Sequence, residues 1–172
     1  MVDAFRDYAR LPAPSLTGVD LNVLVREVLA LYENSKVPII ARLSAALRPV
    51  RADATQIRQV LHNLIQNAQD ALESDKWTTR PVIEVRTEML GDRVRIAVSD
   101  NGPGFPEEMM TRIFEPYVTT KPRGTGLGLA VVKKIVDEHH GSIAIENRAE
   151  RGACVSVLLP AMGEQGAASK AA

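Results

Sequence analysis

The sequence predicts a two-layer α/β sandwich, in which several strands form one sheet and three longer helices cover one of its faces. Apolar and polar residues alternate in Pro81 to Met89 and in Arg93 to Ser99, and Gly91-Asp92 between them indicates a β-hairpin. Elsewhere apolar residues recur at helical spacing. The three helical segments are 21–33, 53–73 and 126–139. With 172 residues the chain is long enough for one domain with a proper core.

The first 18 residues are expected to lie outside that domain. Residues 1–10 indicate the end of a helix, which Pro12 and Pro14 stop. A helix that opens with apolar residues and no cap suggests the remnant of an upstream helical element. Leu11 to Gly18 is then a linker.

Two helices with recognisable N-caps dominate the next part of the chain. Asp20 is a good N-cap for a helix from Leu21 to Glu33, and Asp53 caps one that runs to about Glu73. Residues 37–43 and 47–51 are strand candidates, and residues 74–80 are expected to form a polar loop.

The C-terminal half is predicted to contain a short helix near Glu107 to Ile113 and a flexible stretch from Glu115 to Arg123. A helix from Gly126 to His139 follows, with Gly141 as its C-cap. The last strand pair occupies 142–146 and 153–159, and residues 163–172 are small and polar, which predicts disorder. The domain itself is expected to span residues 19–160, and the disordered tail residues 161–172.

Composition excludes several classes of protein. Basic and acidic residues number 21 each, so no global field attracts nucleic acid or an anionic membrane. The single cysteine, Cys154, excludes an internal disulfide and a cysteine-based zinc site. No apolar run approaches the roughly 20 residues of a membrane helix, and no signal peptide opens the chain. A cytoplasmic module is therefore expected.

Asn63, Asn67 and Asp70 lie about one turn apart on the second long helix. Asparagine is a middling helix former, so two on one stripe need a reason. An amide oxygen can ligate Mg²⁺ when phosphates and water supply the other ligands. A solvated helix face explains the same pattern, and the spacing alone leaves both readings open.

Asp100 follows an apolar strand and begins the first glycine cluster, Asp100 to Gly104. An ionised carboxylate only accepts hydrogen bonds, so it can select adenine by its exocyclic amine. Gly102 and Gly104 are expected to let the backbone turn tightly around the base. Taken alone, the cluster is also an ordinary turn signal.

The second glycine cluster leads directly into a helix, where backbone N–H groups can hold phosphates. Its residues are Gly124, Thr125, Gly126, Leu127, Gly128 and Leu129. Between the clusters, Phe114 and a polar stretch with Thr120 fit a lid over nucleotide. Lys121 and Arg123 are the nearest cations for a γ-phosphate. Close helix packing and an ordinary mobile loop are the alternatives.

Taken together and in order, these segments resemble the boxes of sensor histidine kinases. Asn63 to Ala68 resembles the N box, Asp100 to Gly104 the first G box, Phe114 to Tyr117 the F box, and Gly124 to Ala130 the second G box. The chain is therefore similar to the catalytic and ATP-binding domain of a two-component histidine kinase. That resemblance implies the Bergerat fold, a mixed and mostly antiparallel sheet under three helices.

The resemblance also implies roles for single residues. Asn67 is expected to ligate Mg²⁺ with Asn63 nearby, and Asp100 to bind the adenine amine of ATP. Asn63, Lys121 and Arg123 are the expected catalytic residues. The remaining nucleotide-binding residues implied are Asp70, Gly102, Gly104, Phe114, Thr120, Gly124, Thr125, Gly126, Leu127, Gly128 and Leu129. Position 70 departs from the family, since many relatives carry a cation there.

Short stretches such as Leu31-Tyr32-Glu33 are similar to nitrogen-regulatory sensor kinases of the NtrY type. The resemblance implies transfer of the γ-phosphoryl group to a histidine on a separate dimerisation domain, for relay to a response regulator. No histidine of this chain, at 62, 139 or 140, is followed by the acidic residue expected beside a phosphoacceptor. The fragment is expected to be monomeric and unable to phosphorylate itself. Its parent is expected to be a homodimer anchored in the inner membrane.

Two other functions fit the same boxes. One is an ATPase of the gyrase B, MutL or heat-shock chaperone kind, which usually carries a catalytic glutamate on the asparagine helix. Here the residues at the preceding turns are Asn63 and Gln59. The other is a non-catalytic interaction module of the same fold.

Overall fold

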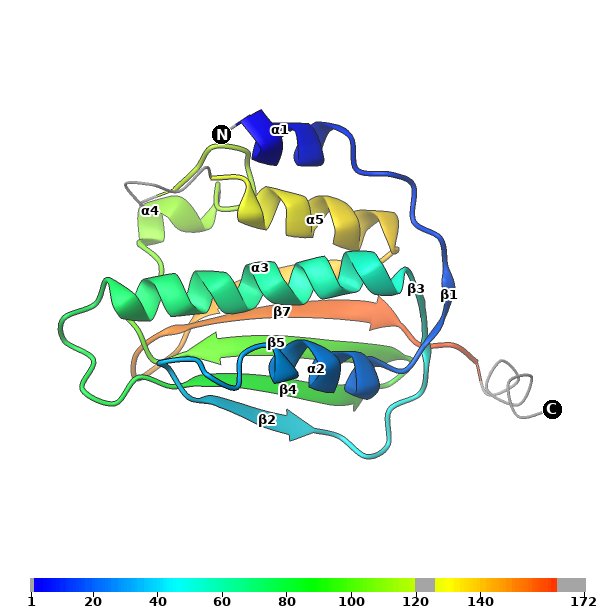
Figure 1. Cartoon of the computed structure of the whole chain (residues 1–172), viewed down its shortest axis with the longest axis horizontal. Helices are drawn as coiled ribbons and strands as arrows, with labels where there is room; N and C mark the ends of the chain where they lie inside the picture. The colour runs from blue at the N-terminus through cyan, green and yellow to red at the C-terminus, as the bar shows by residue number, and fades with distance from the viewer. Residues whose placement is uncertain (1, 120–125, 164–172) are drawn as a thin grey trace.

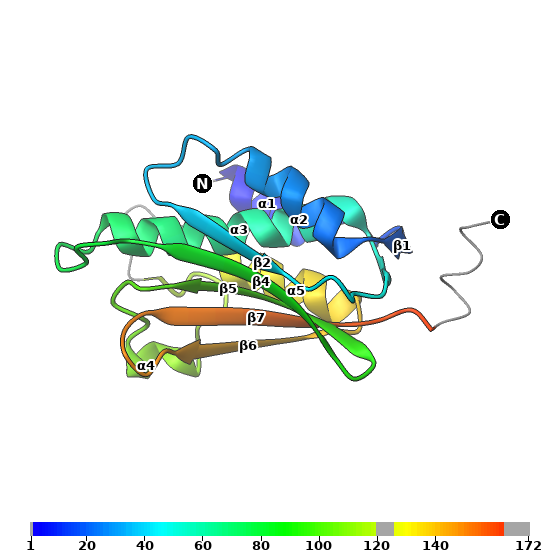
Figure 2. The ribbon, with the colours of Figure 1, turned by 90° about the horizontal axis from the view of Figure 1, so that it is seen from below.

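The computed structural model describes residues 2–119 and 126–163. Figure 1 shows helices α2, α3 and α5 lying on one face of a sheet, and Figure 2 shows the two layers from the side. The helices are α1 (Val2–Ala9), α2 (Leu21–Ala30), α3 (Ala54–Glu73), α4 (Glu107–Met110) and α5 (Gly128–Glu138). The strands are β1 (Thr17–Val19), β2 (Ile39–Leu43), β3 (Val50–Ala52), β4 (Ile83–Leu90), β5 (Arg93–Asp100), β6 (Ser142–Asn147) and β7 (Ala153–Pro160). The predicted two-layer sandwich is confirmed.

The main sheet has five strands in the order β2-β4-β5-β7-β6. β2 pairs parallel with β4, and the other three pairings are antiparallel. The predicted β4–β5 hairpin is confirmed, with Leu90 opposite Arg93 and Ile83 opposite Asp100. Asp100 therefore ends a strand in the middle of the sheet, where neighbouring strands can shield it from water.

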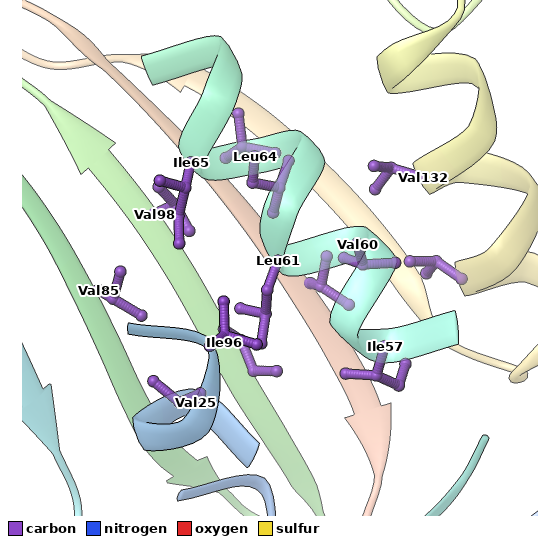
Figure 3. Packing of buried hydrophobic residues seen from close by; sticks show 14 of the residues in the cluster. Val25, Ile57, Val60, Leu61, Leu64, Ile65, Val85, Ile96, Val98 and Val132 are labelled. Atoms are coloured by element: carbon purple, nitrogen blue, oxygen red, sulfur yellow. The ribbon is translucent and has the colours of Figure 1, made fainter. Parts of the chain in front are cut away.

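Helix α3 carries much of the core. The side chain of Asp53 caps it by accepting a hydrogen bond from the Gln56 N–H at 3.2 Å. Apolar residues at helical spacing then meet β4, β5, α2 and α5, as the labelled side chains of Figure 3 show. Those on α3 are Ile57, Val60, Leu61, Leu64 and Ile65, all at most 2 % exposed. Because this face is fixed in the core, the polar residues of α3 are fixed on its other sides.

The structure corrects several boundaries. α2 ends at Ala30 and is followed by turns, so the predicted end at Glu33 is three residues too late. α5 starts at Gly128 and not at Gly126, because Gly126 has a φ of +71°, outside the helical region. α4 is a single turn that ends at Met110.

The C-terminus of α5 is closed by a Schellman motif that includes His140. His140 has a φ of +57°, its N–H donates to the Asp137 carbonyl at 3.1 Å, and the Gly141 N–H donates to the Val136 carbonyl at 3.0 Å. The left-handed residue is therefore His140, not the predicted Gly141. Gly141 is needed for space, since a Cβ there would lie 2.4 Å from the Leu158 carbonyl oxygen.

The segment expected to be a linker is attached to the domain. Its last residues form β1, which pairs antiparallel with β3, a strand pair that the sequence did not predict. The Gln56 side chain donates to the Pro12 carbonyl at 2.8 Å, and Lys134 donates to the Tyr8 carbonyl at 3.2 Å. Whether residues 1–18 belong to an upstream helical domain remains a prediction.

The described residues contain no helix that is both long and apolar enough to cross a membrane. The predicted tail falls largely on residues 164–172, which lie outside the part of the chain that the structure describes.

Candidate functional site

A cavity of about 310 Å³ lies between α3, the end of β5, the loop after β5 and the start of α5. This size is in the range of small-molecule sites. Eight of the predicted site residues line it: Asn63, Asn67, Asp70, Asp100, Gly104, Gly126, Gly128 and Leu129. Segments that are up to 66 positions apart in the sequence are thus brought to one cavity.

Polar side chains of α3 form one wall. The Asn63 amide nitrogen donates to the Gly128 carbonyl at 3.2 Å, which joins the middle of α3 to the start of α5. The Asn67 amide oxygen lies 3.8 Å from the position that a Cβ on Gly128 would occupy. Asp70 accepts a hydrogen bond from Gln66 at 2.9 Å. This wall therefore presents amide and carboxylate groups beside a helix N-terminus.

Asp100 lies at the inner end of the cavity and is only 7 % exposed. Burial raises the pKa of Asp100, while the backbone N–H groups of Gly102 and Ala153 and the guanidinium of Arg148 act in the opposite direction. The Gly102 N–H donates to its Oδ1 at 2.9 Å. A buried carboxylate among apolar walls suits a ligand that offers a hydrogen-bond donor.

Both glycines of the first cluster are required by protein contacts. A Cβ on Gly102 would lie 3.0 Å from Oδ1 of Asp100. Gly104 has a φ of +79°, and a Cβ there would lie 2.7 Å from the Asn147 amide oxygen. Both glycines are expected from the sequence to let the backbone turn around a base. The structure adds a further reason for Gly104, because Asn147, which lies 43 positions later at the end of β6, leaves no room for a Cβ.

The second glycine cluster is described from Gly126 onward. A Cβ on Gly126 would lie 2.4 Å from the Tyr117 carbonyl carbon, and the Tyr117 N–H donates to the Gly126 carbonyl at 2.9 Å. Leu127 is 2 % exposed and is not among the residues that line the cavity. Gly128 begins α5, and its N-cap Leu127 offers no capping side chain. Within the part of the chain that the structure describes, no side chain caps α5, and N–H groups at such a helix start can bind an anion.

Some predicted residues are not brought to the cavity. Phe114 packs against the core cluster and is not among the lining residues. Gly102 is not a lining residue either, but its N–H donates to the carboxylate of Asp100, which does line the cavity. Five others lie outside the described residues: Thr120, Lys121, Arg123, Gly124 and Thr125.

Sequence reasoning missed the apolar wall of the cavity. It consists of Phe105, Met109, Ile113 and Val118, together with Val98, Ala153 and Val155 from the central strands. Met109 and Ile113 are four positions apart in the helix that the sequence predicts near Glu107 to Ile113, a spacing that could have indicated a shared face. In the structure α4 ends at Met110, and Ile113 lies in the turns that follow. The strand residues gave no separate signal, because core and cavity strands have the same pattern.

The cavity thus combines apolar walls, a buried carboxylate, the amides of α3 and the start of a helix, an arrangement suited to a nucleotide. The family described as histidine kinase-, DNA gyrase B-, and HSP90-like ATPase matches residues 52–163. The match covers well over half of the chain, which therefore belongs to this family of ATPase domains.

Relatives of known name support that placement. The nitrogen regulation protein NtrY of Azorhizobium caulinodans is 37% identical over 168 residues, which are 95% of this chain and 22% of that protein. The chain thus spans about a fifth of the length of this curated relative.

Solved structures agree. The catalytic domain of histidine kinase ThkA is 38% identical with a TM-score of 0.75, covering 86% of this chain and 96% of that one. Full-length ShkA in complex with AMPPNP gives a TM-score of 0.79 at 30% identity, covering 94% of this chain and 35% of that one. ThkA is also known in complex with response regulator protein TrrA. The resemblance to sensor histidine kinases is confirmed.

Proposed function

We propose that this domain binds Mg-ATP in the cavity beside α3 and donates the γ-phosphoryl group to a histidine on a separate dimerisation domain. One observation carries the proposal: the cavity joins the buried Asp100, the amides of α3 and the uncapped start of α5. These groups suit the amine of adenine at one end and phosphates at the other.

Asp100 would hold the base. Its carboxylate already accepts the Gly102 N–H, and the apolar walls of Val98, Ala153 and Val155 exclude water from its surroundings. An exocyclic amine can donate to this acceptor, whereas the carbonyl oxygen that guanine has at that position would face a carboxylate. Selection of adenine over guanine follows from this chemistry.

The phosphates would lie between α3 and the start of α5. Backbone N–H groups at a helix N-terminus attract anions, and Gly128 leaves the space beside Asn67 open. Asp70 adds a carboxylate to that wall, so positive charge must come from elsewhere. Lys121, Arg123 and a bound cation are the proposed sources.

The described residues contain no cluster of three or more histidine, cysteine or acidic side chains that could hold a metal by itself. They fit Mg²⁺ that is held mainly by phosphate and water, with the hard amide oxygen of Asn67 as its protein ligand. The ion would neutralise phosphate charge. Asn63, fixed by its bond to Gly128, is proposed to keep α3 and α5 at the spacing this requires.

The proposed transfer moves a single phosphoryl group. The bond between the γ-phosphorus and its bridging oxygen breaks, ADP leaves with the electron pair, and a P–N bond forms to an imidazole that releases its proton to solvent. Such a transfer depends on positioning and charge neutralisation. This domain supplies both, and the dimerisation domain would supply the acceptor.

Further proposals concern the whole kinase. The phosphoryl group is proposed to pass from the histidine to an aspartate of a response regulator, in a dimeric kinase anchored in the inner membrane. We also propose a role in nitrogen regulation. The ThkA–TrrA complex supports the response-regulator step, and the relative named nitrogen regulation protein NtrY supports the regulatory role. The isolated chain is proposed to be monomeric and to bind ATP without phosphorylating itself.

Calorimetric titration with Mg-AMPPNP into the wild type and Asp100→Asn tests the proposal. Loss of a charged hydrogen bond should weaken binding by about 1.5–3 kcal/mol, or roughly 10- to 150-fold. Arg42→Ala, on the outer edge of the sheet, is the control and should bind as the wild type does. No binding by a folded wild-type chain would refute the proposal and favour an interaction module, whereas rapid ATP hydrolysis by the chain alone would favour the ATPase alternative.

A further inference from the structure

The last residue of β6 and the turn that leads to β7, residues 147–152, contact segments on both sides of the cavity, and we call residues 147–152 the clasp. Its first contact is made by Asn147. The Phe105 N–H donates to the Asn147 amide oxygen at 2.8 Å, and the Asn147 amide nitrogen donates to the Phe105 carbonyl at 2.8 Å. One side chain thus pairs with the backbone of Phe105 in the manner of a neighbouring strand.

The second contact holds the backbone of Asp100. Arg148 donates to the Asp100 carbonyl at 3.1 Å, and the Arg148 N–H closes the turn on the Gly152 carbonyl at 2.8 Å. Gly152 has a φ of +103°, and a Cβ there would lie 1.9 Å from the Asp100 carbonyl oxygen. Only glycine permits this approach.

The third contact reaches the loop between α3 and β4. Arg151 donates to Asp75 at 2.5 Å, and the same carboxylate accepts hydrogen bonds from Thr78 and from the Trp77 N–H. Asp75 follows directly on Ser74, which lines the cavity. The clasp therefore links this loop to the segment 100–105 on the other side of the site.

We propose that the clasp positions the segment 100–105 for the nucleotide base, and that Asn147 is the positioning residue that fixes its far end. This inference rests on the proposed function. Asp100 lies at the inner end of the cavity, Phe105 lines it, and the two are joined by a stretch containing Gly102 and Gly104. Its first part is held by the Asn101 side chain, which accepts from the Val82 N–H at 2.9 Å and donates to the Arg80 carbonyl at 2.8 Å. Beyond Gly104 the backbone is more permissive, so the far end at Phe105 is the part that Asn147 has to hold.

The position of Asn147 separates this role from general stabilisation. Its side chain is exposed, so truncating it leaves no cavity in the core and no buried polar group without a partner. Loss of its hydrogen bonds should therefore release the far end of the segment 100–105 while the core is unchanged.

The test uses Asn147→Ala, with Glu146→Ala as the control because Glu146 is the adjacent residue and lies on the opposite face of the sheet. Asn147→Ala should bind Mg-AMPPNP about 5- to 150-fold more weakly, the range for two hydrogen bonds. In the nucleotide-free protein the Phe105 amide should exchange with deuterium faster. Asn147→Asp, which keeps the acceptor and loses the donor, should be intermediate.

A double-mutant cycle with Asp100→Asn gives the decisive readout. If Asn147 acts through the position of Asp100, its removal should cost less affinity once the carboxylate is gone. Additive effects, or unchanged Phe105 exchange in Asn147→Ala, would overturn the inference while leaving the proposed function intact. Absence of binding by the wild type would instead refute the proposed function, and the exchange experiment would still test the clasp.

Discussion

Gly128→Ala tests whether position 128 needs a glycine for ligand binding or for the fold. Gly128 is helical, and a Cβ there meets only the Asn67 amide oxygen at 3.8 Å, an ordinary contact. Alanine also has a higher helix propensity, by up to about 1 kcal/mol. The nucleotide-free variant should therefore be as stable as the wild type or have a Tm higher by up to roughly 2–4 °C.

Binding should change in the opposite direction. The added methyl group occupies space beside Asn67 where we place the phosphates, and overpacking costs about 1–3 kcal/mol. Titration with Mg-AMPPNP should then show affinity reduced roughly 5- to 150-fold. Unchanged affinity would refute the placement of the phosphates, and a loss of stability above about 1 kcal/mol in urea unfolding would show that the glycine is structural.

Two other glycines provide matched comparisons. Gly126→Ala combines a φ of +71° with a clash of 2.4 Å against the Tyr117 backbone. Gly91→Ala has a φ of +62° with no atom within 4 Å of the new Cβ. Gly91→Ala should cost only the strain of the left-handed conformation, about 1–2 kcal/mol, and Gly126→Ala distinctly more. Equal losses of unfolding free energy in the two variants, measured in urea, would mean that the Tyr117 backbone moves aside for the new Cβ at no cost.

Three further outcomes are expected. Burial raises the pKa of Asp100, so affinity for Mg-AMPPNP should fall as pH falls through that pKa. Titration calorimetry at several pH values should find this loss of affinity above the pH range in which an ordinary exposed aspartate titrates. Asp100→Asn should bind weakly at every pH. Hydrogen bonds from Thr78 and Arg151 lower the pKa of Asp75 to about 2, so its contribution to the free energy of unfolding should be present above about pH 4 and be lost as pH falls toward 2. Urea unfolding at several pH values should show this loss, and Asp75→Asn should lack it. Leu61→Ala should reduce the free energy of unfolding by about 2–5 kcal/mol because Leu61 is 1 % exposed and does not line the cavity beside α3, so the space left would be enclosed by the core. An effect below about 1 kcal/mol would contradict the packing described.

Much of the fold could be predicted because its signals are local. The hairpin between β4 and β5 follows from alternation and a Gly-Asp turn, and α3 from a cap and an apolar stripe. Element ends were less predictable. α5 starts only after Gly126, whose left-handed backbone packs against Tyr117. β1 has no pattern of its own because it exists only through its partner β3.

The candidate site shows the same division. Helical spacing alone places Asn63, Asn67 and Asp70 near one another, and a strand end followed by glycines singles out Asp100, so the sequence by itself determined the polar groups of the site. Only the tertiary structure decided the apolar wall around Met109 and Ile113, the burial of Leu127 away from the cavity, and the role of the clasp. The physical reason is that these features depend on contacts between segments distant in sequence, whose partners no local pattern specifies.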